Sequence, residues 1–143
     1  EKGYRDYGYD MDNTDTPLEA GLGFAVDFDK PDGFIGRESL LKVKESGPLK
    51  RRLVQFLLED PETLMYSSMP IYRDGARAGH LGSGGYGHTL GGAVGLGYVN
   101  HEEGVTSAFI NSGRFEIEIQ GVRYPAKASL RPMYDPRGLK VRS

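Results

Sequence analysis

Glycine occupies 21 of the 143 positions, and most of these glycines lie outside any helical pattern. Glycine is a poor helix former because it loses more backbone entropy on folding than other residues. The apolar runs between the glycines have the length of strands and lack a sustained helical repeat. This spacing restricts the chain to a β-rich domain in which helices are few and short.

Several segments that follow Gly47 and Pro48 have the length and composition of strands. They are residues 51–58, 69–72, 76–81, 93–99, 114–119 and 122–126. Asp74 and Gly75 form a strong hairpin signal between two of them. In the segment 114–119, apolar and charged residues alternate, so one face is buried and the other is wet. Short strands joined by turns predict an antiparallel sandwich or barrel between about Leu49 and Pro136.

The clearest predicted helix precedes these strands, in the stretch ESLLKVKES. Leu40, Leu41 and Val43 form an apolar stripe between charged residues. Gly47 and Pro48 end the helix, because glycine accepts the left-handed cap conformation and proline cannot continue a helix. We therefore place a boundary here, between residues 1–47 and residues 48–143.

Upstream of the helix, Thr16 to Glu19 reads TPLE, which is typical of a helix start. Threonine would cap the turn, proline would take the first helical position, and glutamate would reach back to the cap. Gly21 and Gly23 keep this turn short. The following apolar residues alternate as in a strand, and they are Leu22, Phe24, Val26 and Phe28.

Composition excludes several function classes. The formal net charge is −2 and no polybasic run occurs, so neither a nucleic-acid nor an anionic-membrane partner is expected. No apolar run approaches the roughly 20 residues that cross a bilayer. The absence of cysteine excludes disulfides, thiolate metal sites and a cysteine nucleophile.

The stretch Gly82 to Gly87 matches the G-x-G-x-x-G spacing of dinucleotide-binding loops. Such a loop requires a buried parallel strand before it and a helix directly after it. Here two adjacent glycines, Gly91 and Gly92, stand where the helix would have to propagate, each costing about 1 kcal/mol relative to alanine. We interpret the stretch as bulges and bends where barrel strands approach closely, and not as a phosphate loop.

Other candidates for chemistry are equally weak. His80, His88 and His101 match neither a helical pair of ligands nor a short zinc spacing. Ser83 lacks the first glycine of a nucleophile elbow. An acidic run near the start of the chain lacks the glycine and the terminal glutamate of a calcium loop, and consists of Asp6, Asp10, Asp12 and Asp15. No metal site is predicted, and these residues alone supply no reaction.

Longer stretches of the sequence resemble the glycine cleavage T-protein (aminomethyltransferase) family. They are EKGYRDYGYDMDNTDTPLEAGLGFAV, DKPDGFIGRESLLKVKESG, RRLVQFLL, SGGYGHTLGGAVGLGYV and YPAKASLRPMYDP. Together they cover nearly the whole chain. In detail the chain is most similar to the C-terminal part of sarcosine and dimethylglycine dehydrogenases, in which a T-protein-like half follows a flavin-bearing half.

The resemblance implies a mainly β fold, namely a six-stranded Greek-key antiparallel barrel with a short α/β segment before it. Residues 1–47 would be the tail of a folate-binding domain, and residues 48–143 the C-terminal aminomethyltransferase barrel. The family binds tetrahydrofolate and passes it a one-carbon unit from an aminomethyl-lipoyl carrier protein or from an iminium made by the flavin half. FAD would belong to the parent only in the dehydrogenase branch.

The resemblance also implies candidate folate contacts. Glu1 heads the Glu-x-Gly-x-x-x-Tyr-Gly motif that carries the family's pterin-binding glutamate, and one carboxylate can accept two adjacent pterin N–H groups. Lys30 stands where relatives place a folate-contacting arginine, and Arg37 is a second cation for the folate carboxylates. Arg131 and Tyr134 are the nearest matches to the family's C-terminal contacts. An exposed glutamate and solvated charges remain the alternative at these positions.

The family's catalytic aspartate is expected upstream of this segment, so no catalytic residue is assigned within it. Accordingly, we expect the chain to be part of a longer enzyme, to depend on the N-terminal half of its own parent, and to be inactive with weak folate binding when isolated. We expect a cytoplasmic location in a bacterium or the mitochondrial matrix in a eukaryote, and no secretion.

Three alternatives remain open at this point. The parent could be a stand-alone glycine cleavage aminomethyltransferase. It could be a demethylase within the same superfamily that acts on a sulfonium or methylamine substrate. The chain could also be a β-barrel scaffold or interaction module that keeps the fold without folate chemistry.

Overall fold

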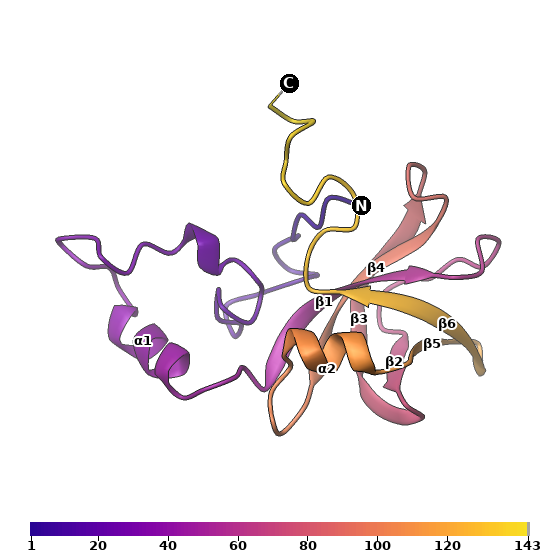
Figure 1. The fold of residues 1–143 in the computed structure, drawn as a ribbon, viewed down its shortest axis with the longest axis horizontal. Helices are drawn as coiled ribbons and strands as arrows, with labels where there is room; N and C mark the ends of the chain where they lie inside the picture. The colour runs from indigo at the N-terminus through magenta and orange to yellow at the C-terminus, as the bar shows by residue number, and fades with distance from the viewer. Residues whose placement is uncertain (143) are drawn as a thin grey trace.

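The computed structural model describes residues 1–142. A β-barrel forms one side of the molecule, and an N-terminal segment extends from it to α1 at the other side (Figure 1). None of the helices among the described residues is long and apolar enough to cross a membrane. The C-terminal segment leaves the barrel and passes close to the N-terminus.

Six antiparallel strands close the barrel in the order β1-β4-β3-β2-β5-β6. Their bounds are Arg51–Leu58 for β1, Pro70–Arg73 for β2, Ala76–Gly87 for β3, Gly92–Asn100 for β4, Phe115–Ile119 for β5 and Val122–Ser129 for β6. Strands β2, β3 and β4 follow one another as neighbours, and β1 returns beside β4, which is the Greek-key arrangement. The predicted mainly β, six-stranded antiparallel barrel is confirmed.

The barrel interior is the main hydrophobic core. Phe56 of β1 is fully buried and its ring centre lies 5.7 Å from that of Phe115 on β5. Phe115, Ile117 and Ile119 are buried while the charged residues between them are only partly covered, as the alternation predicted. The fully buried residues of this core all lie between residues 54 and 117.

The turns follow the sequence signals. Asp74 and Gly75 both have positive φ, at 50° and 85°, as a two-residue hairpin between β2 and β3 requires. The stretch Gly82 to Gly87, which has the spacing of a dinucleotide-binding loop, is part of strand β3. This strand contains a bulge between Leu81 and Ser83. A Cβ atom on Gly82 would lie 2.6 Å from the carbonyl oxygen of Tyr9. The predicted bulge is confirmed, whereas the backbone that approaches Gly82 belongs to the N-terminal segment and not to a neighbouring strand.

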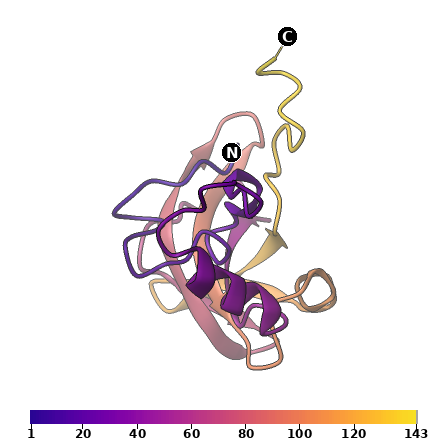
Figure 2. The ribbon, with the colours of Figure 1, turned by 90° about the vertical axis from the view of Figure 1, so that its left-hand side faces the viewer.

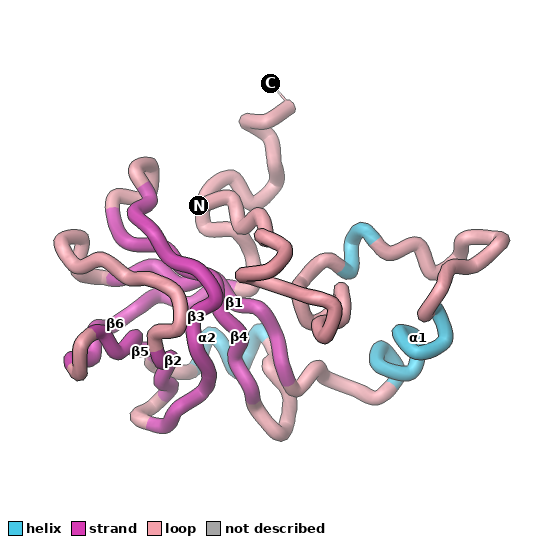
Figure 3. The backbone as a smooth tube through the Cα atoms, turned by 180° about the vertical axis from the view of Figure 1, so that it is seen from behind, coloured by secondary structure: helices cyan, strands magenta, loops and turns pink. Residues whose placement is uncertain are grey.

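The N-terminal segment, residues 1–47, contains little regular structure (Figure 3). Helix α1, Arg37–Glu45, confirms the predicted helix. Thr16 and Glu19 form the predicted reciprocal cap, since each backbone N–H donates to the other side chain. Only a turn follows, however, because Gly21 adopts φ +70°. Seen from the side of α1, the segment lies in front of the barrel (Figure 2).

The secondary structure differs from the prediction in two places. The strand expected from Leu22 to Phe28 is wrong, because Gly23–Ala25 forms a 3-10 turn, η1, and Phe24 is 85% exposed. No neighbouring strand pairs with this stretch among the described residues, so its alternation has no sheet to bury it. Helix α2, Ser107–Ser112, was not predicted, and Thr106 caps it by accepting from the N–H of Phe109.

Candidate functional site

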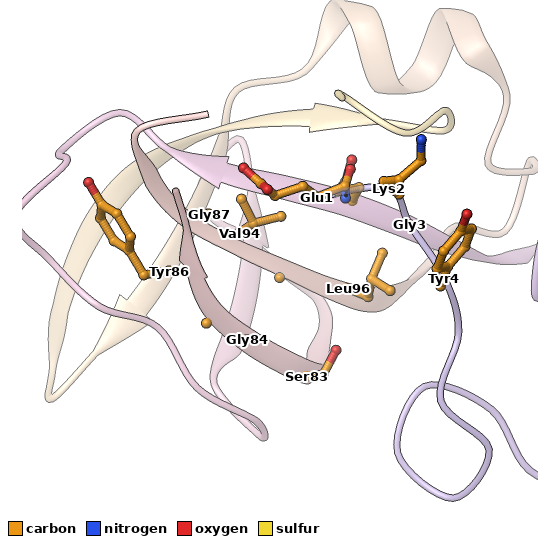
Figure 4. Close-up of a pocket in the computed structure, with 13 residues that line it drawn as sticks. Glu1, Lys2, Gly3, Tyr4, Ser83, Gly84, Tyr86, Gly87, Val94 and Leu96 are labelled. Atoms are coloured by element: carbon orange, nitrogen blue, oxygen red, sulfur yellow. Dashed lines mark hydrogen bonds between the residues drawn. The ribbon is translucent and has the colours of Figure 1, made fainter. Parts of the chain in front are cut away.

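A pocket of about 430 Å³ lies where the N-terminal residues cross strands β3 and β4 (Figure 4). Its lining combines an acidic and a basic side chain with glycine, aromatic and aliphatic groups. The lining residues are Glu1, Lys2, Gly3, Tyr4, Gln55, Ser83, Gly84, Gly85, Tyr86, Gly87, Val94, Gly95 and Leu96. In Figure 4 the Glu1 side chain lies beside the part of β4 that carries Val94.

The carboxylate of Glu1 is held by the tip of the β3–β4 hairpin. Its Oε1 atom accepts hydrogen bonds from the backbone N–H groups of Thr89 at 2.7 Å and Leu90 at 2.8 Å. The bond from Leu90, together with that from Thr89, lowers the pKa of Glu1 and outweighs the opposing effect of desolvation. The group is therefore an anionic acceptor at neutral pH.

The backbone of Glu1 is fixed by Gln55, a buried polar residue in the middle of β1. The Gln55 amide nitrogen donates to the Glu1 carbonyl oxygen at 3.1 Å, and its amide oxygen accepts from the N–H of Met133 at 2.6 Å. Tyr134 also donates its N–H to the Glu1 carbonyl at 3.4 Å. One barrel side chain thus joins the N-terminal and C-terminal segments at the pocket.

Glycines on β3 leave room for this arrangement. A Cβ on Gly87 would lie 3.1 Å from Cγ of Glu1 and 2.7 Å from a methyl group of Val94, so a larger residue would displace the glutamate. Gly85 lies two positions earlier on the strand and therefore faces the same side. A Cβ on Gly85 would meet nothing within 4 Å, and this residue lines open space in the pocket.

Tyr134 lies close to Glu1, and Arg131 lies in a cavity beside the Glu1 pocket. The ammonium groups of Lys2 and Lys140 lie 5.5 and 4.8 Å from the centre of the Tyr134 ring. Lys2 forms an ion pair with Asp135 at 2.7 Å, and this bond lowers the pKa of that carboxyl. Arg131 lines an adjoining cavity of about 540 Å³ that shares Lys2 with the Glu1 pocket.

The other two predicted cations lie elsewhere. Lys30 lines a separate cavity of about 730 Å³ within the N-terminal segment, where α1 faces residues 13–17. Arg37, the first residue of α1, donates from Nε to the carbonyl oxygen of Phe28 at 2.9 Å. Neither residue lines the pocket of Glu1. The five predicted folate contacts therefore divide into one group at the barrel and another at α1.

Two other polar residues considered from the sequence make contacts away from the mouth of the Glu1 pocket. His101 stacks on Phe109 with ring centres 4.1 Å apart, and Asp10 accepts hydrogen bonds from Ser83 and from the N–H of Asp6. Among residues 1–142, no cluster of three histidine or acidic groups could hold a metal ion.

Sequence reasoning missed Gln55 and the hairpin amides as parts of the site. The signal for Gln55 was present, because it is the one polar residue in the run Leu53–Leu58. A buried amide is retained only where it finds partners, so an interior glutamine marks a junction. Backbone N–H groups leave no trace in residue types, and Thr89 and Leu90 could not have been found in that way.

Comparison with known proteins gives a consistent result. Residues 51–135 match the family described as the glycine cleavage T-protein C-terminal barrel domain. The crystal structure of glycine cleavage system aminomethyltransferase T from Bartonella henselae superposes with a TM-score of 0.71 and 25% sequence identity. The superposition covers 87% of this chain and 34% of that chain.

Three curated relatives match almost the whole chain. A 4-methylaminobutanoate oxidase (formaldehyde-forming) of Paenarthrobacter nicotinovorans is 42% identical, and mitochondrial sarcosine dehydrogenase of Homo sapiens is 37% identical, each over 99% of this chain. A mitochondrial pyruvate dehydrogenase phosphatase regulatory subunit of Mus musculus is 41% identical over 93% of this chain. In each case the chain spans 16% of the relative's length.

Proposed function

The chain belongs to the glycine cleavage T-protein family, and on that premise we propose that its Glu1 pocket is one wall of a tetrahydrofolate site. The parent would be an enzyme that oxidises a methylated amine and passes the one-carbon unit to the folate. The single observation that carries this proposal is an anionic Glu1 fixed at the mouth of a glycine-walled pocket.

The pocket fits a reduced pterin chemically. A pterin presents a ring N–H beside an amino group, and a carboxylate that only accepts hydrogen bonds can take both. Val94 and Leu96 supply apolar surface, and the half-exposed Tyr86 supplies an aromatic face. The folate's own carboxylates would require cations, for which Arg131 lines the adjoining cavity and Lys30 and Arg37 lie at or near α1.

The division of labour follows the two parts of the chain. Residues 1–47 would continue a folate-binding domain, and residues 48–143 would close the site from the barrel side. The proton transfers of the reaction would belong to residues beyond this chain, so Glu1 binds and orients the folate here without exchanging a proton. The names of the bacterial and human relatives favour an amine-oxidising parent.

Gly85 provides the test. Gly85→Leu places an apolar side chain in the pocket at a position where the Cβ meets nothing within 4 Å, so tetrahydrofolate binding by the full-length gene product should weaken at least about tenfold in calorimetry. Gly85→Ala is the matched control and should bind within a few-fold of the wild type. The thermal midpoint should be unchanged in both variants. Equal affinity in Gly85→Leu and the wild type would refute a folate site in this pocket.

A second function is favoured by one specific observation, the phosphatase regulatory subunit among the relatives. In that case the barrel would serve as an interaction module without folate chemistry. The same calorimetry separates the two functions, because a module of this kind would release no heat with tetrahydrofolate even in the wild type.

A further inference from the structure

We propose that the tip of the β3–β4 hairpin, residues 88–91, is a positioning element that aims the Glu1 carboxylate at its ligand. The part of this inference that concerns folate rests on the function proposed above. The part that concerns Glu1 itself stands on the geometry of the chain.

The tip contains backbone N–H groups that do not bind a carbonyl within the tip itself. The N–H of Gly91 donates to the carbonyl of Gly87 at 2.8 Å, which closes a single turn of helical type between the two strands. The amides at the start of such a turn have no carbonyl to bind within the turn, as at the start of a helix. Successive N–H groups of this kind form a concave anion site.

Glu1 satisfies those amides and is fixed by them. Thr89 and Leu90 both donate to one oxygen, Oε1. The side chain of Thr89 also forms a hydrogen bond with this carboxylate, and that bond too lowers the pKa of Glu1. Since a carboxylate offers about four acceptor positions, acceptor capacity beyond the bonds from the tip remains for a ligand. Gly87 makes the approach possible, because any Cβ there would lie 3.1 Å from the glutamate side chain.

This arrangement gives the barrel a role in recognition. Glu1 lies outside the barrel strands, and its orientation depends on two backbone amides of the hairpin that joins β3 and β4. A carboxylate fixed in this way can accept from a ligand with adjacent N–H groups but does not donate a proton. The hairpin tip therefore determines which atom faces the ligand, and we assign it as a positioning element, not as a catalytic one.

The first experiment shortens the hairpin. Replacing residues 88–91 by Asn-Gly joins Gly87 and Gly92, which already pair, through a two-residue turn and removes both donors. In residues 1–143, carbon-13 NMR of the Glu1 carboxyl should then show its pKa rising toward the ordinary value. Gln120→Asn is the control, because Gln120 occupies a left-handed turn position that asparagine accepts, away from Glu1. This control should leave the pKa of Glu1 unchanged.

A second measurement needs no change in the loop. The amide protons of Thr89 and Leu90 should shift with pH at the same midpoint as the Glu1 carboxyl carbon. Glu1→Gln should abolish that titration. Amide shifts that ignore the ionisation of Glu1, or a Glu1 pKa that stays unchanged in the shortened hairpin, would overturn the proposal.

The two proposals fail in different ways. In the full-length gene product, tetrahydrofolate should bind roughly tenfold more weakly when the hairpin is shortened. Coupled titration without any folate binding by the wild type would sustain the positioning element and refute the folate site. Equal folate binding by the shortened hairpin would refute the positioning element and leave the folate site intact.

Discussion

The barrel and the N-terminal segment are stabilised by different means. The barrel has a closed ladder of backbone hydrogen bonds and a continuous apolar core. The N-terminal segment has one nine-residue helix and leaves five large apolar side chains exposed, namely Tyr4, Tyr7, Tyr9, Phe24 and Ile35. Its polar attachments to the barrel include Asp10 with Ser83, Asp15 with Arg51, and Glu1 with Gln55.

This difference explains how the site is built. The barrel can stabilise itself by burying apolar surface, so it supplies a rigid framework. The segment that carries Glu1 contributes no residue to the main hydrophobic core, and hydrogen bonds from the barrel and its hairpin hold Glu1. Precise placement of the glutamate therefore depends on a few hydrogen bonds, while the fold depends on many apolar contacts.

The largest expected effect is in the barrel core. Phe56→Ala removes a fully buried ring and should lower the free energy of unfolding by about 3–5 kcal/mol, measured by urea denaturation. Phe24→Ala removes a ring of the same kind that is 85% exposed, and should change stability by less than about 0.5 kcal/mol. Comparable losses in the two variants would break the contrast between the regions.

A smaller effect is expected at the polar junction. Asp10 is buried, and its carboxylate accepts from the hydroxyl of Ser83 and the N–H of Asp6. Asp10→Ala should cost about 2 kcal/mol, because the hydrogen bonds that this buried carboxylate accepts are lost. Hydrogen exchange should quicken in residues 1–25 while β1 and β4 keep their protection.

The matched control at this junction is Asp12→Ala. Asp12 is exposed and binds only within its own turn, through Thr14, so exchange in the rest of the segment should remain as in the wild type. If Asp10→Ala lowered protection in the barrel as much as in the segment, the two regions would unfold as one unit.

The smallest effect is expected at Tyr98, which faces the junction from β4. Its hydroxyl is buried and has no hydrogen-bond partner among residues 1–142, and the Arg51 guanidinium lies 3.6 Å from its ring centre. Tyr98→Phe keeps the ring contact and removes the unpaired hydroxyl. Stability at pH 7 should rise by about 1 kcal/mol.

The substitution Tyr98→Phe should also change how the free energy of unfolding depends on pH. Burial raises the pKa of Tyr98 to about 12, whereas an unfolded tyrosine ionises near pH 10. The folded wild type therefore loses stability relative to the unfolded chain as the pH rises from about 10 to 12. Urea denaturation of Tyr98→Phe should lack this part of the loss. Identical pH dependence in the two proteins would show that the hydroxyl is not desolvated.

The sequence predicted the barrel well because strand alternation and turn chemistry are local. The Asp74-Gly75 hairpin and the buried face of Phe115, Ile117 and Ile119 follow from such patterns. The stretch around Phe24 misled the prediction, because alternation forms a strand only where a neighbouring strand pairs with it. The site was harder to predict, since its donors at Thr89 and Leu90 are backbone groups that any residue type provides.

The resemblance to a known family supplied what the residue patterns could not. The residue types near Glu1 in the sequence do not by themselves indicate a ligand. Only the family motif that Glu1 heads pointed to a pterin. The structure adds a physical reason for this choice, since Glu1 is the carboxylate that the hairpin amides and Gln55 both hold.

A structure of the full-length gene product crystallised with tetrahydrofolate would address the account most directly. The account predicts pterin nitrogens within hydrogen-bond distance of the Glu1 carboxylate, with Thr89 and Leu90 still donating to its Oε1 atom. A folate bound away from Glu1, or a Glu1 side chain turned from the hairpin tip in the complex, would contradict it.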